Sequence, residues 1–468
     1  MLVDTHAHLT SEQFDPDRDE VIRRALDAGV EWMVNPATDP EDSRRALALA
    51  EREPAVFACV GLHPHQAGSA GPGWAEEMER MARHERVVGI GEIGLDYHYL
   101  HAPPDLQKEV FREQLAIAAR LDLPVVVHTR ESLGDALLIL EEFTGAHPSW
   151  RTPRGVPPGR YPGPRGVFHC FSGDRDAAWR LIRMGFFISF PGILTFPNAS
   201  GVRETAAALP VQHLLVETDC PYMSPVPHRG KRNEPRHALL VAAELARLHG
   251  IPEADVSRAT THGAGRLFRR GEPAPPEIVY RLGDSLYINL TIRCNADCVF
   301  CDRKGEAVIK GYNLRLQREP AVEEVTAAIG DPGSFREVVF CGYGEPTIRL
   351  EELKAVAQWV KARGGRTRLN TNGHGSVING RDIVPELVGL IDAVSISLNA
   401  TDAGTYGSLM RLDGPRFFAA MLDFARACVR LLGAVTMTVV AVEDLDLEKA
   451  RRIAEEDVGA RFQVRPLF

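Results

Sequence analysis

Eight short apolar runs alternate with longer segments of helical spacing over the first 270 residues, and this alternation limits the possible folds. The runs are almost continuously apolar, as parallel strands are when both faces of their sheet are covered. Eight strand–helix units in a segment of this length are what a closed (β/α)8 barrel requires. The sequence therefore predicts barrel strands at 2–4, 32–35, 56–61, 87–91, 125–128, 167–169, 187–190 and 214–217.

A second, shorter alternation follows a proline-rich segment, GEPAPPE at 271–277. We expect three parts: a barrel over 1–270, a linker over 271–282 and a smaller α/β unit over 283–468. The smaller unit is expected to be a partial (β/α)6 barrel with strands at 285–290, 338–341, 366–370, 393–398, 435–442 and 461–464. The proline and glycine content of residues 144–165 predicts a long surface loop within the first barrel.

The composition excludes several classes of protein. Apolar residues make up 44% and charged residues 25%, which excludes a wholly disordered chain. The net charge of −9 leaves no overall basic excess, so any contact with nucleic acid must use a local patch. No apolar stretch is long enough for a membrane span and no signal peptide is evident. We therefore expect a cytoplasmic protein whose eight cysteines do not form a disulfide scaffold.

Six side chains of the types that bind metals lie at the predicted strand ends. Residues two apart on a strand share a face, and all strand ends of a barrel meet on one side. Histidine and carboxylate ligands together suit one or two divalent ions, such as Zn²⁺, Mn²⁺ or Mg²⁺. The predicted metal ligands are His6, His8, Glu92, His128, His169 and Asp219.

The motifs around these residues resemble the TatD family of metal-dependent hydrolases. The matching stretches include DTHAHL, GLHPHQA, GEIGLDYH, PVVVHTR, HCFSG and ETDCPYMSP, from residue 4 onwards. The resemblance implies that His6, His8 and Asp219 bind one ion, that His128 and His169 bind the other, and that Glu92 bridges them. It also implies that activated water attacks phosphorus and that Asp219 accepts a proton. Most characterised members are 3′→5′ deoxyribonucleases or phosphodiesterases.

Basic residues after the eighth strand suit a phosphate substrate. Residues 228–237 read HRGKRNEPRH, and Arg229, Lys231 and Arg232 are the candidate substrate contacts. His63, after the third strand, is a further candidate for a substrate contact. DNA is accordingly the expected partner of the barrel.

Cysteines 294, 298 and 301 form a C-x3-C-x2-C motif directly after the first strand of the second unit. Cys294, Cys298 and Cys301 are one ligand short of a four-cysteine structural zinc site. Three thiolates suit a 4Fe–4S cluster with one open iron, which is free to bind a second molecule. The sequence GYGEP at 342–346 follows the next strand, and its glycines let the backbone approach a ligand closely.

Together these two motifs resemble the radical S-adenosylmethionine superfamily. The resemblance implies a cluster that chelates S-adenosylmethionine, an external electron donor, and a contact of Glu345 with the amino group of the cofactor. The substrate of the radical reaction is left open. The candidate cofactor contacts are Phe300, Gly342, Gly344, Glu345, Asn370, Asn372 and Ser397.

Two alternatives remain open at this point. The barrel could be an esterase or amidase, for example a D-aminoacyl-tRNA deacylase, because some relatives are implicated in that reaction. One of the two domains could instead be a non-catalytic scaffold for the other. Hydrolysis assays on oligonucleotides and on acyl esters distinguish the first alternative, and metal and iron analysis tests the second.

Overall fold

The structure, a computed structural model, describes residues 2–69, 71–147, 150, 163–271, 274–440 and 445–465. These residues form two compact units, one up to residue 271 and one from residue 274. Most of the loop predicted over 144–165 lies outside the described residues. Its first three residues belong to helix α5 (Leu133–Ala146).

The first unit is an eight-stranded parallel barrel. Each predicted strand overlaps an observed one, and the strands pair in chain order from β1 to β8. Between β8 and β1 the backbone N–H of Thr5 donates to the carbonyl of Val216 at 3.1 Å, and a parallel bridge joins Ala7 to Cys220. The predicted (β/α)8 fold is therefore confirmed. The strands are β1 (Leu2–Asp4), β2 (Val30–Pro36), β3 (Val56–Val60), β4 (Val87–Asp96), β5 (Val125–Arg130), β6 (Gly166–Phe168), β7 (Phe186–Phe190) and β8 (Leu214–Val216).

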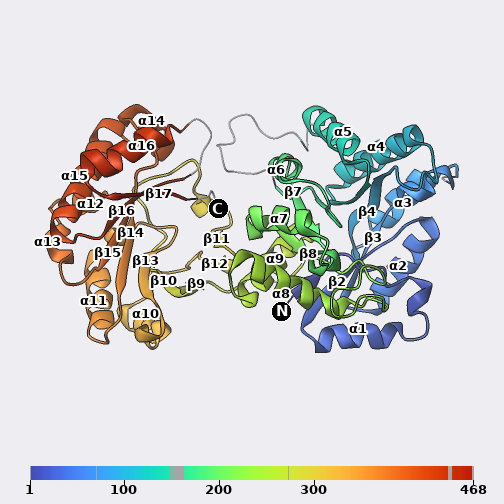
Figure 1. The fold of residues 1–468 in the computed structure, drawn as a ribbon, viewed down its shortest axis with the longest axis horizontal. Coiled ribbons are helices and arrows are strands. Elements are labelled where there is room, and N and C mark those ends of the chain that lie inside the picture. The colour runs from blue at the N-terminus through green and yellow to red at the C-terminus, as the bar shows by residue number, and fades with distance from the viewer. Residues whose placement is uncertain are drawn as a thin grey trace. The chain divides into compact units, whose positions relative to one another are not determined.

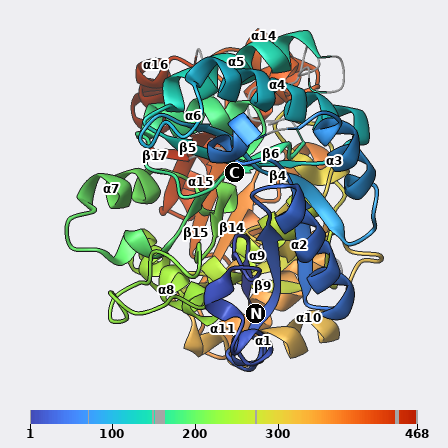
Figure 2. The same cartoon turned by 90° about the vertical axis from the view of Figure 1, so that its right-hand side faces the viewer.

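Helices surround the barrel, as Figure 2 shows. Their apolar faces pack on the outward-facing side chains of the strands, and this contact forms the largest hydrophobic core of the unit. The helices are α1 (Arg18–Asp27), α2 (Pro40–Arg52), α3 (Trp74–Ala82), α4 (Pro104–Leu121), α5, α6 (Arg175–Arg183), α7 (Ser200–Ala208), α8 (Ala238–His249) and α9 (Glu253–Phe268).

Helix α9 closes one end of the barrel. Its residues Ala264, Leu267 and Phe268 pack with buried apolar side chains contributed by all eight strands, among them Val126 and Leu215. Residues from every strand can meet in one cluster only inside the barrel. The N-terminal half of the interior is therefore a closed apolar core, and polar chemistry is confined to the opposite end.

The second unit is built on a seven-stranded sheet with the order β17-β16-β15-β14-β13-β10-β9. Six of its strands are parallel and match the six predicted ones, so the predicted α/β fold is confirmed. They are β10 (Ser285–Asn289), β13 (Glu337–Cys341), β14 (Thr367–Thr371), β15 (Ala393–Ser397), β16 (Val435–Val440) and β17 (Arg461–Arg465).

The seventh strand corrects the predicted linker. Strand β9 (Val279–Leu282) lies within the expected linker 271–282 and pairs antiparallel with β10. Leu282 is opposite Ser285, so the turn consists of Gly283 and Asp284, with Gly283 at a φ of 58°. A Gly-Asp pair between strand-forming residues is a hairpin signal, and the proline content just before it masked that signal.

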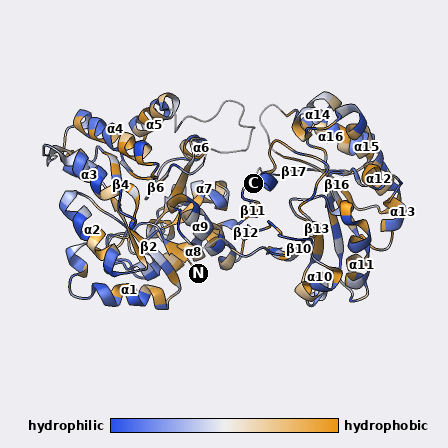
Figure 3. Ribbon diagram, turned by 180° about the vertical axis from the view of Figure 1, so that it is seen from behind, coloured by the Kyte–Doolittle hydropathy of each residue, from blue (hydrophilic) through white to orange (hydrophobic). Residues whose placement is uncertain are grey.

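Helices cover one face of this sheet (Figure 1). The burial of β14 and β15 alternates along the chain, because one face packs on the helices and the other does not. Figure 3 shows the hydrophobic residues concentrated in the sheets and on the inner faces of the helices.

The helices of this unit are α10 (Val322–Ile329), α11 (Leu350–Lys361), α12 (Gly375–Asn379), α13 (Val384–Leu387), α14 (Ala403–Met410), α15 (Gly414–Leu431) and α16 (Leu447–Arg452). A small hairpin of β11 (Val308–Ile309) and β12 (Tyr312–Asn313) is separate from the large sheet. No helix in the described part of the chain has the length and apolarity needed to cross a membrane.

Candidate active sites

Strand periodicity carries three polar side chains into the open end of the barrel. Val126, Val167 and Leu215 belong to the apolar interior, and the residues two positions later point to the same side of each strand. These residues are His128, His169 and Glu217. The same strands therefore supply an apolar layer against α9 and a layer of ligand-type side chains at the other end.

Glu92 lies at the centre of this layer, and its two carboxylate oxygens face different partners. Oε1 lies 2.9 Å from Nδ1 of His128 and 2.8 Å from Nε2 of His169. Oε2 lies 3.4 Å from Nε2 of His6 and 3.4 Å from Nε2 of His8. Glu92 is only 3% exposed. A carboxylate divided in this way has the geometry of a bridging ligand between two cations.

Asp219 completes the group around Oε2 of Glu92. Its Oδ1 lies 3.5 Å from Nε2 of His8 and 3.8 Å from Nε2 of His6. The backbone of Asp219 has a φ of 53°, a left-handed conformation that Asp adopts more readily than most residues. The backbone N–H of Asp219 donates to the carbonyl of His6 at 2.9 Å, which holds the loop after β8 against the loop after β1.

The protonation states of these groups fit a cation site. Burial opposes the ionisation of Glu92, but the positive charge of His169 and His63 and the hydrogen bonds from the histidines lower its pKa well below the usual range. Burial likewise opposes the ionisation of Asp219, and a hydrogen bond to His8 together with the charge of His6 lowers its pKa. The pKa of His169 is raised well above normal, because Glu92 and Glu217 outweigh the effect of burial. Metal ions compete with such protons, because histidine binds metal in its neutral form.

The types of donor atom in this cluster also fit a site for divalent metal ions. Three overlapping groups of ligand atoms each lie within 4.8 Å: His6, His169 and Glu217; His6, His8 and Glu92; and His63, Glu92 and His128. Nδ1 of His6 and Oε2 of Glu217 are buried and have no hydrogen-bond partner among the described residues. Nitrogen and carboxylate oxygen donors at this spacing suit divalent ions.

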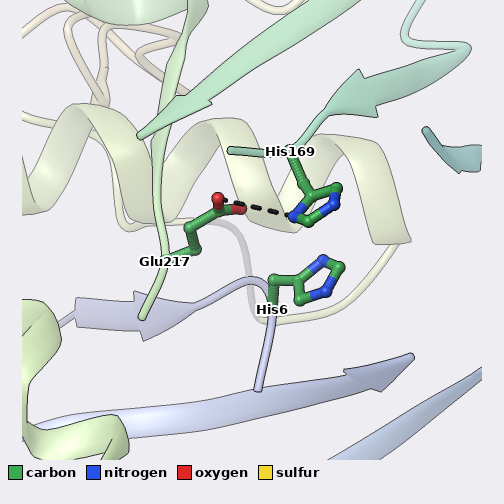
Figure 4. Close-up of side chains that lie close together, drawn as sticks. All are labelled: His6, His169 and Glu217. Carbon is green, nitrogen blue, oxygen red and sulfur yellow. Dashed lines mark ion pairs between the residues drawn. The ribbon is translucent and has the colours of Figure 1, made fainter. Parts of the chain in front are cut away.

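Glu217 and Asp96 are site residues that the sequence analysis missed. Glu217 is fully buried, and its Oε1 accepts a hydrogen bond from the N–H of Cys170 at 2.5 Å and lies 3.7 Å from Nδ1 of His169 (Figure 4). Oδ2 of Asp96 lies 3.1 Å from Nε2 of His128, on the opposite side of that ring from Glu92. Carboxylates in this position orient the imidazole of a metal ligand. The signal for Glu217 was its place two residues after the inward-facing Leu215.

Two of the predicted substrate residues have other surroundings than expected. Nε2 of His63 lies 3.4 Å from Oε1 of Glu92, so His63 belongs to the cluster itself. The guanidinium of Arg232 forms two hydrogen bonds to Asp17, at 2.8 and 2.7 Å. Arg232 therefore stabilises the contact between its own loop and the start of helix α1, whereas the sequence predicted a contact with the substrate. Arg229 and Lys231 are exposed, and the guanidinium of Arg229 lies 4.2 Å from the ring centre of Phe196.

Three of the cysteines of the second unit, Cys294, Cys298 and Cys301, lie on the loop after β10, where the backbone N–H of Cys301 donates to the carbonyl of Cys298 at 3.0 Å. Burial raises the pKa of Cys294 to about 11 and that of Cys298 to about 12, and the charges of the neighbouring thiolates add to both shifts. Sγ of Cys294 also lies 3.8 Å from the side-chain nitrogen of Asn372, at the end of β14, and Phe300 packs against the core of the unit. Three partly buried thiols on one loop fit a 4Fe–4S cluster.

The GYGEP loop packs directly on the segment that leads to Cys294. A Cβ atom on Gly344 would lie 2.1 Å from the carbonyl oxygen of Thr291, so only glycine fits there. A Cβ atom on Gly342, which has a φ of 150°, would lie 2.8 Å from the side-chain oxygen of Asn289.

Glu345 is 2% exposed and ties the same loop to β14. Its Oε1 accepts hydrogen bonds from the Thr347 and Thr371 hydroxyls at 2.6 and 2.8 Å, and its Oε2 accepts from the N–H of Asn372 at 2.8 Å. These hydrogen bonds within the protein use most of the acceptor capacity of the Glu345 carboxylate, which was expected to contact the amino group of S-adenosylmethionine. Asn370 and Ser397 contact Cys341 and Arg465, at 3.5 and 3.3 Å.

Comparison with known proteins assigns both units to families. Residues 3–269 match the family described as TatD related DNase, and residues 288–456 match the Radical SAM superfamily. The uncharacterized metal-dependent hydrolase YabD of Bacillus subtilis (strain 168) is 39% identical over 269 residues, which are 58% of this chain and 99% of that protein. The 3′-5′ ssDNA/RNA exonuclease TatD of Erwinia tasmaniensis is 33% identical over 273 residues, which are 57% of this chain and 99% of that protein.

A solved structure shares the barrel. The crystal structure of YJJV, a TatD homologue from Escherichia coli K12, has 33% sequence identity and a TM-score of 0.52, and the match covers 58% of this chain and 98% of that chain. The chain is therefore an enzyme that belongs to the TatD related DNase family and carries, after its barrel, a domain of the radical S-adenosylmethionine superfamily.

Proposed function

We propose that the first unit hydrolyses phosphodiester bonds at the 3′ ends of nucleic acid, most readily DNA, with two divalent ions. The observation that carries this proposal is that the two oxygens of Glu92 face different pairs of histidines. His128 and His169 lie at Oε1, and His6 and His8 lie at Oε2. The exonuclease name of the Erwinia tasmaniensis relative supports the substrate class.

The protein residues of this site have separable roles. Divalent ions, when bound, supply Lewis acidity and lower the pKa of water. Asp219 is ionised and lies beside His8, so its Oδ1 is the group that accepts a proton from an attacking water. Asp96 holds the ring of His128 from behind, and Glu217 lies behind the ring of His169 at a longer distance of 3.7 Å. Arg229 and Lys231 provide exposed positive charge for the phosphates of the bound strand.

The second unit, in this proposal, holds a 4Fe–4S cluster on Cys294, Cys298 and Cys301 and binds S-adenosylmethionine. The bound cofactor pair supplies a one-electron cleavage, which requires an external electron donor. The GYGEP loop and Asn372 position the cysteine loop, because Gly344 packs on Thr291 and the side chain of Asn372 reaches Cys294. None of the eight cysteines, all of which lie in the described part of the chain, forms a disulfide, and a reducing, cytoplasmic location is part of the proposal.

The test compares substrates under defined metal content. Metal-loaded protein is expected to shorten single-stranded DNA from the 3′ end and to leave a 3′-blocked strand intact. An aminoacyl ester hydrolysed faster than DNA would move the barrel to the esterase class. Absence of both activities in protein with full metal and iron content would favour a scaffold role.

A further inference from the structure

The open face of the second sheet is polar and carries an excess of positive charge. Residues that alternate with the helix-packed ones point to this face, and the strand register places Tyr287, Arg368, Asn370, Ser397, Gln463 and Arg465 there. Their helix-facing neighbours are apolar and belong to the core, for example Leu369 and Ile396. The apolar core that stabilises the sheet lies on its helix-covered face, so the polar residues of the open face are not needed to form that core.

Two arginines from strands β14 and β17 lie on this face. Arg368 on β14 donates from Nη2 to the hydroxyl of Tyr287 at 3.2 Å and lies 3.2 Å from Oε1 of Glu337. Arg465 on β17 donates from Nη2 to the hydroxyl of Ser397 at 3.3 Å. Burial lowers the pKa of Arg465, Cys341 and Tyr287 oppose this shift, and the charge of Arg368 adds to it.

The protein leaves these cations incompletely compensated. Glu337 is shared between Arg368 and Arg336, and among the described residues no ion pair involves Arg465. The Nε atoms of both Arg368 and Arg465 are buried and have no hydrogen-bond partner in the described part of the chain. Buried guanidinium donors need an acceptor, and a charged acceptor satisfies them best.

The position of the pair relates it to the cysteine loop. Arg368 precedes Asn372 by four residues on β14, and Asn372 contacts Cys294. At about 3.3 Å per residue, Arg368 lies roughly 13 Å along the strand direction from Asn372, whereas Ser397, the partner of Arg465, is level with Asn372 in the strand register. A molecule that contacts both arginines would therefore lie along the open face and reach the strand ends next to the cysteine loop.

We propose that Arg368 and Arg465 form a subsite for an anionic oxygen group, a carboxylate or a phosphate, on the substrate of the radical reaction. This proposal rests on the proposed function of the second unit and names the substrate class for it. The paired guanidinium groups supply the charge, and Tyr287 and Ser397 hold them in place. The anionic group of the ligand supplies the hydrogen-bond acceptors that the two Nε atoms lack among the described residues.

Calorimetric titration of the full chain with inorganic phosphate and, separately, with acetate tests the subsite. Wild-type protein is expected to bind at least one of these anions, and Arg465→Gln or Arg368→Gln is expected to weaken this binding at least tenfold. Arg461→Gln is the matched control, because Arg461 lies on the same strand and face but is exposed. Binding at the barrel is common to all these proteins and cancels in the comparison.

Two further results decide the proposal. Identical isotherms for the wild type and both variants would overturn it, and melting curves show which variants are folded. If Arg368→Gln does not fold, Arg465→Gln carries the test, since Arg465 ends an edge strand. Phosphate binding should persist in the presence of saturating S-adenosylhomocysteine, and displacement would assign the arginines to the cofactor instead. A protein that assembles no cluster would refute the proposed function while leaving the anion measurement intact.

Discussion

Nε2 of His169 lies 2.8 Å from Oε1 of Glu92, and this contact joins the strand end of β6 to the middle of β4. Since the other oxygen of Glu92 faces His6 and His8, replacement of this one carboxylate should disturb both halves of the site. Glu92→Gln is expected to bind fewer than two ions and to lose at least about a hundredfold in hydrolysis rate. Metal analysis and a DNA hydrolysis assay measure both effects. The exposed Glu76→Gln is the control, and full activity in Glu92→Gln would refute the bridging role.

The exposed cations beside the barrel mouth should determine the salt dependence of nucleic-acid binding. Each phosphate contact on a single strand contributes about 0.7 to the slope of log affinity against log salt. Arg229→Ala combined with Lys231→Ala is therefore expected to flatten that slope by about 1.4. Arg232→Ala should leave the slope unchanged and lower the melting temperature, because Arg232 pairs with Asp17. An unchanged slope in the double variant would show that these residues do not touch the substrate.

Loss of one cysteine should remove the cluster and spare the barrel. In Cys298→Ala only two of the three neighbouring thiols remain, too few to hold four irons securely. We expect iron content, the visible absorption of the reconstituted protein and formation of 5′-deoxyadenosine to fall to background. DNA hydrolysis should persist, because the barrel ligands belong to the other unit. Cys428→Ala, a buried core cysteine, is the control that should retain iron.

The contact of Gly344 with Thr291 predicts a steric effect. In Gly344→Ala the new methyl group would lie 2.1 Å from a backbone oxygen, so the GYGEP loop must move. We expect the second unit to lose more than about 2 kcal/mol of stability and to bind less iron. At Gly404 the nearest atom within 4 Å is the flexible Oδ1 of Asp402 at 3.3 Å, so Gly404→Ala should be tolerated. Equal stability of the two variants in thermal unfolding would contradict this reasoning.

Burial of His374 predicts acid sensitivity of the second unit. His374 is fully buried, with Nδ1 3.0 Å from the side-chain nitrogen of Asn295 and Nε2 2.8 Å from the hydroxyl of Tyr406, and burial lowers its pKa to about 4. The unfolded chain takes up a proton near pH 6.5, so the folded state binds fewer protons between pH 6.5 and 4. The free energy of unfolding should therefore fall by up to about 3 kcal/mol as the pH is lowered through this window.

Denaturant unfolding of the wild type and of His374→Gln across this pH range isolates the contribution of His374. The difference between the two free energies should change with pH. A constant difference would mean that His374 is not responsible for the acid sensitivity.

The sequence by itself determined the two folds and most candidate ligands. Short apolar runs at regular spacing can bury their side chains only as covered parallel strands, so the parallel strands of both large sheets could be located, whereas the antiparallel strand β9 was missed. His6, His8, His128 and His169 follow such runs directly, and C-x3-C-x2-C is a local pattern that needs no tertiary information.

Only the tertiary structure decided which distant residues share a site. Glu217 and Asp96 reach His169 and His128 because of how the barrel closes, and no local pattern encodes that contact. Arg368 and Arg465 are 97 residues apart in the numbering and share a face of one sheet only because four neighbouring strands pair in order. In the sequence Arg232 is a basic residue like its neighbours Arg229 and Lys231, and only the structure shows that it is hydrogen-bonded to Asp17. Charge and hydrogen bonding act through space, so the role of a polar side chain depends on the partners that the fold brings to it.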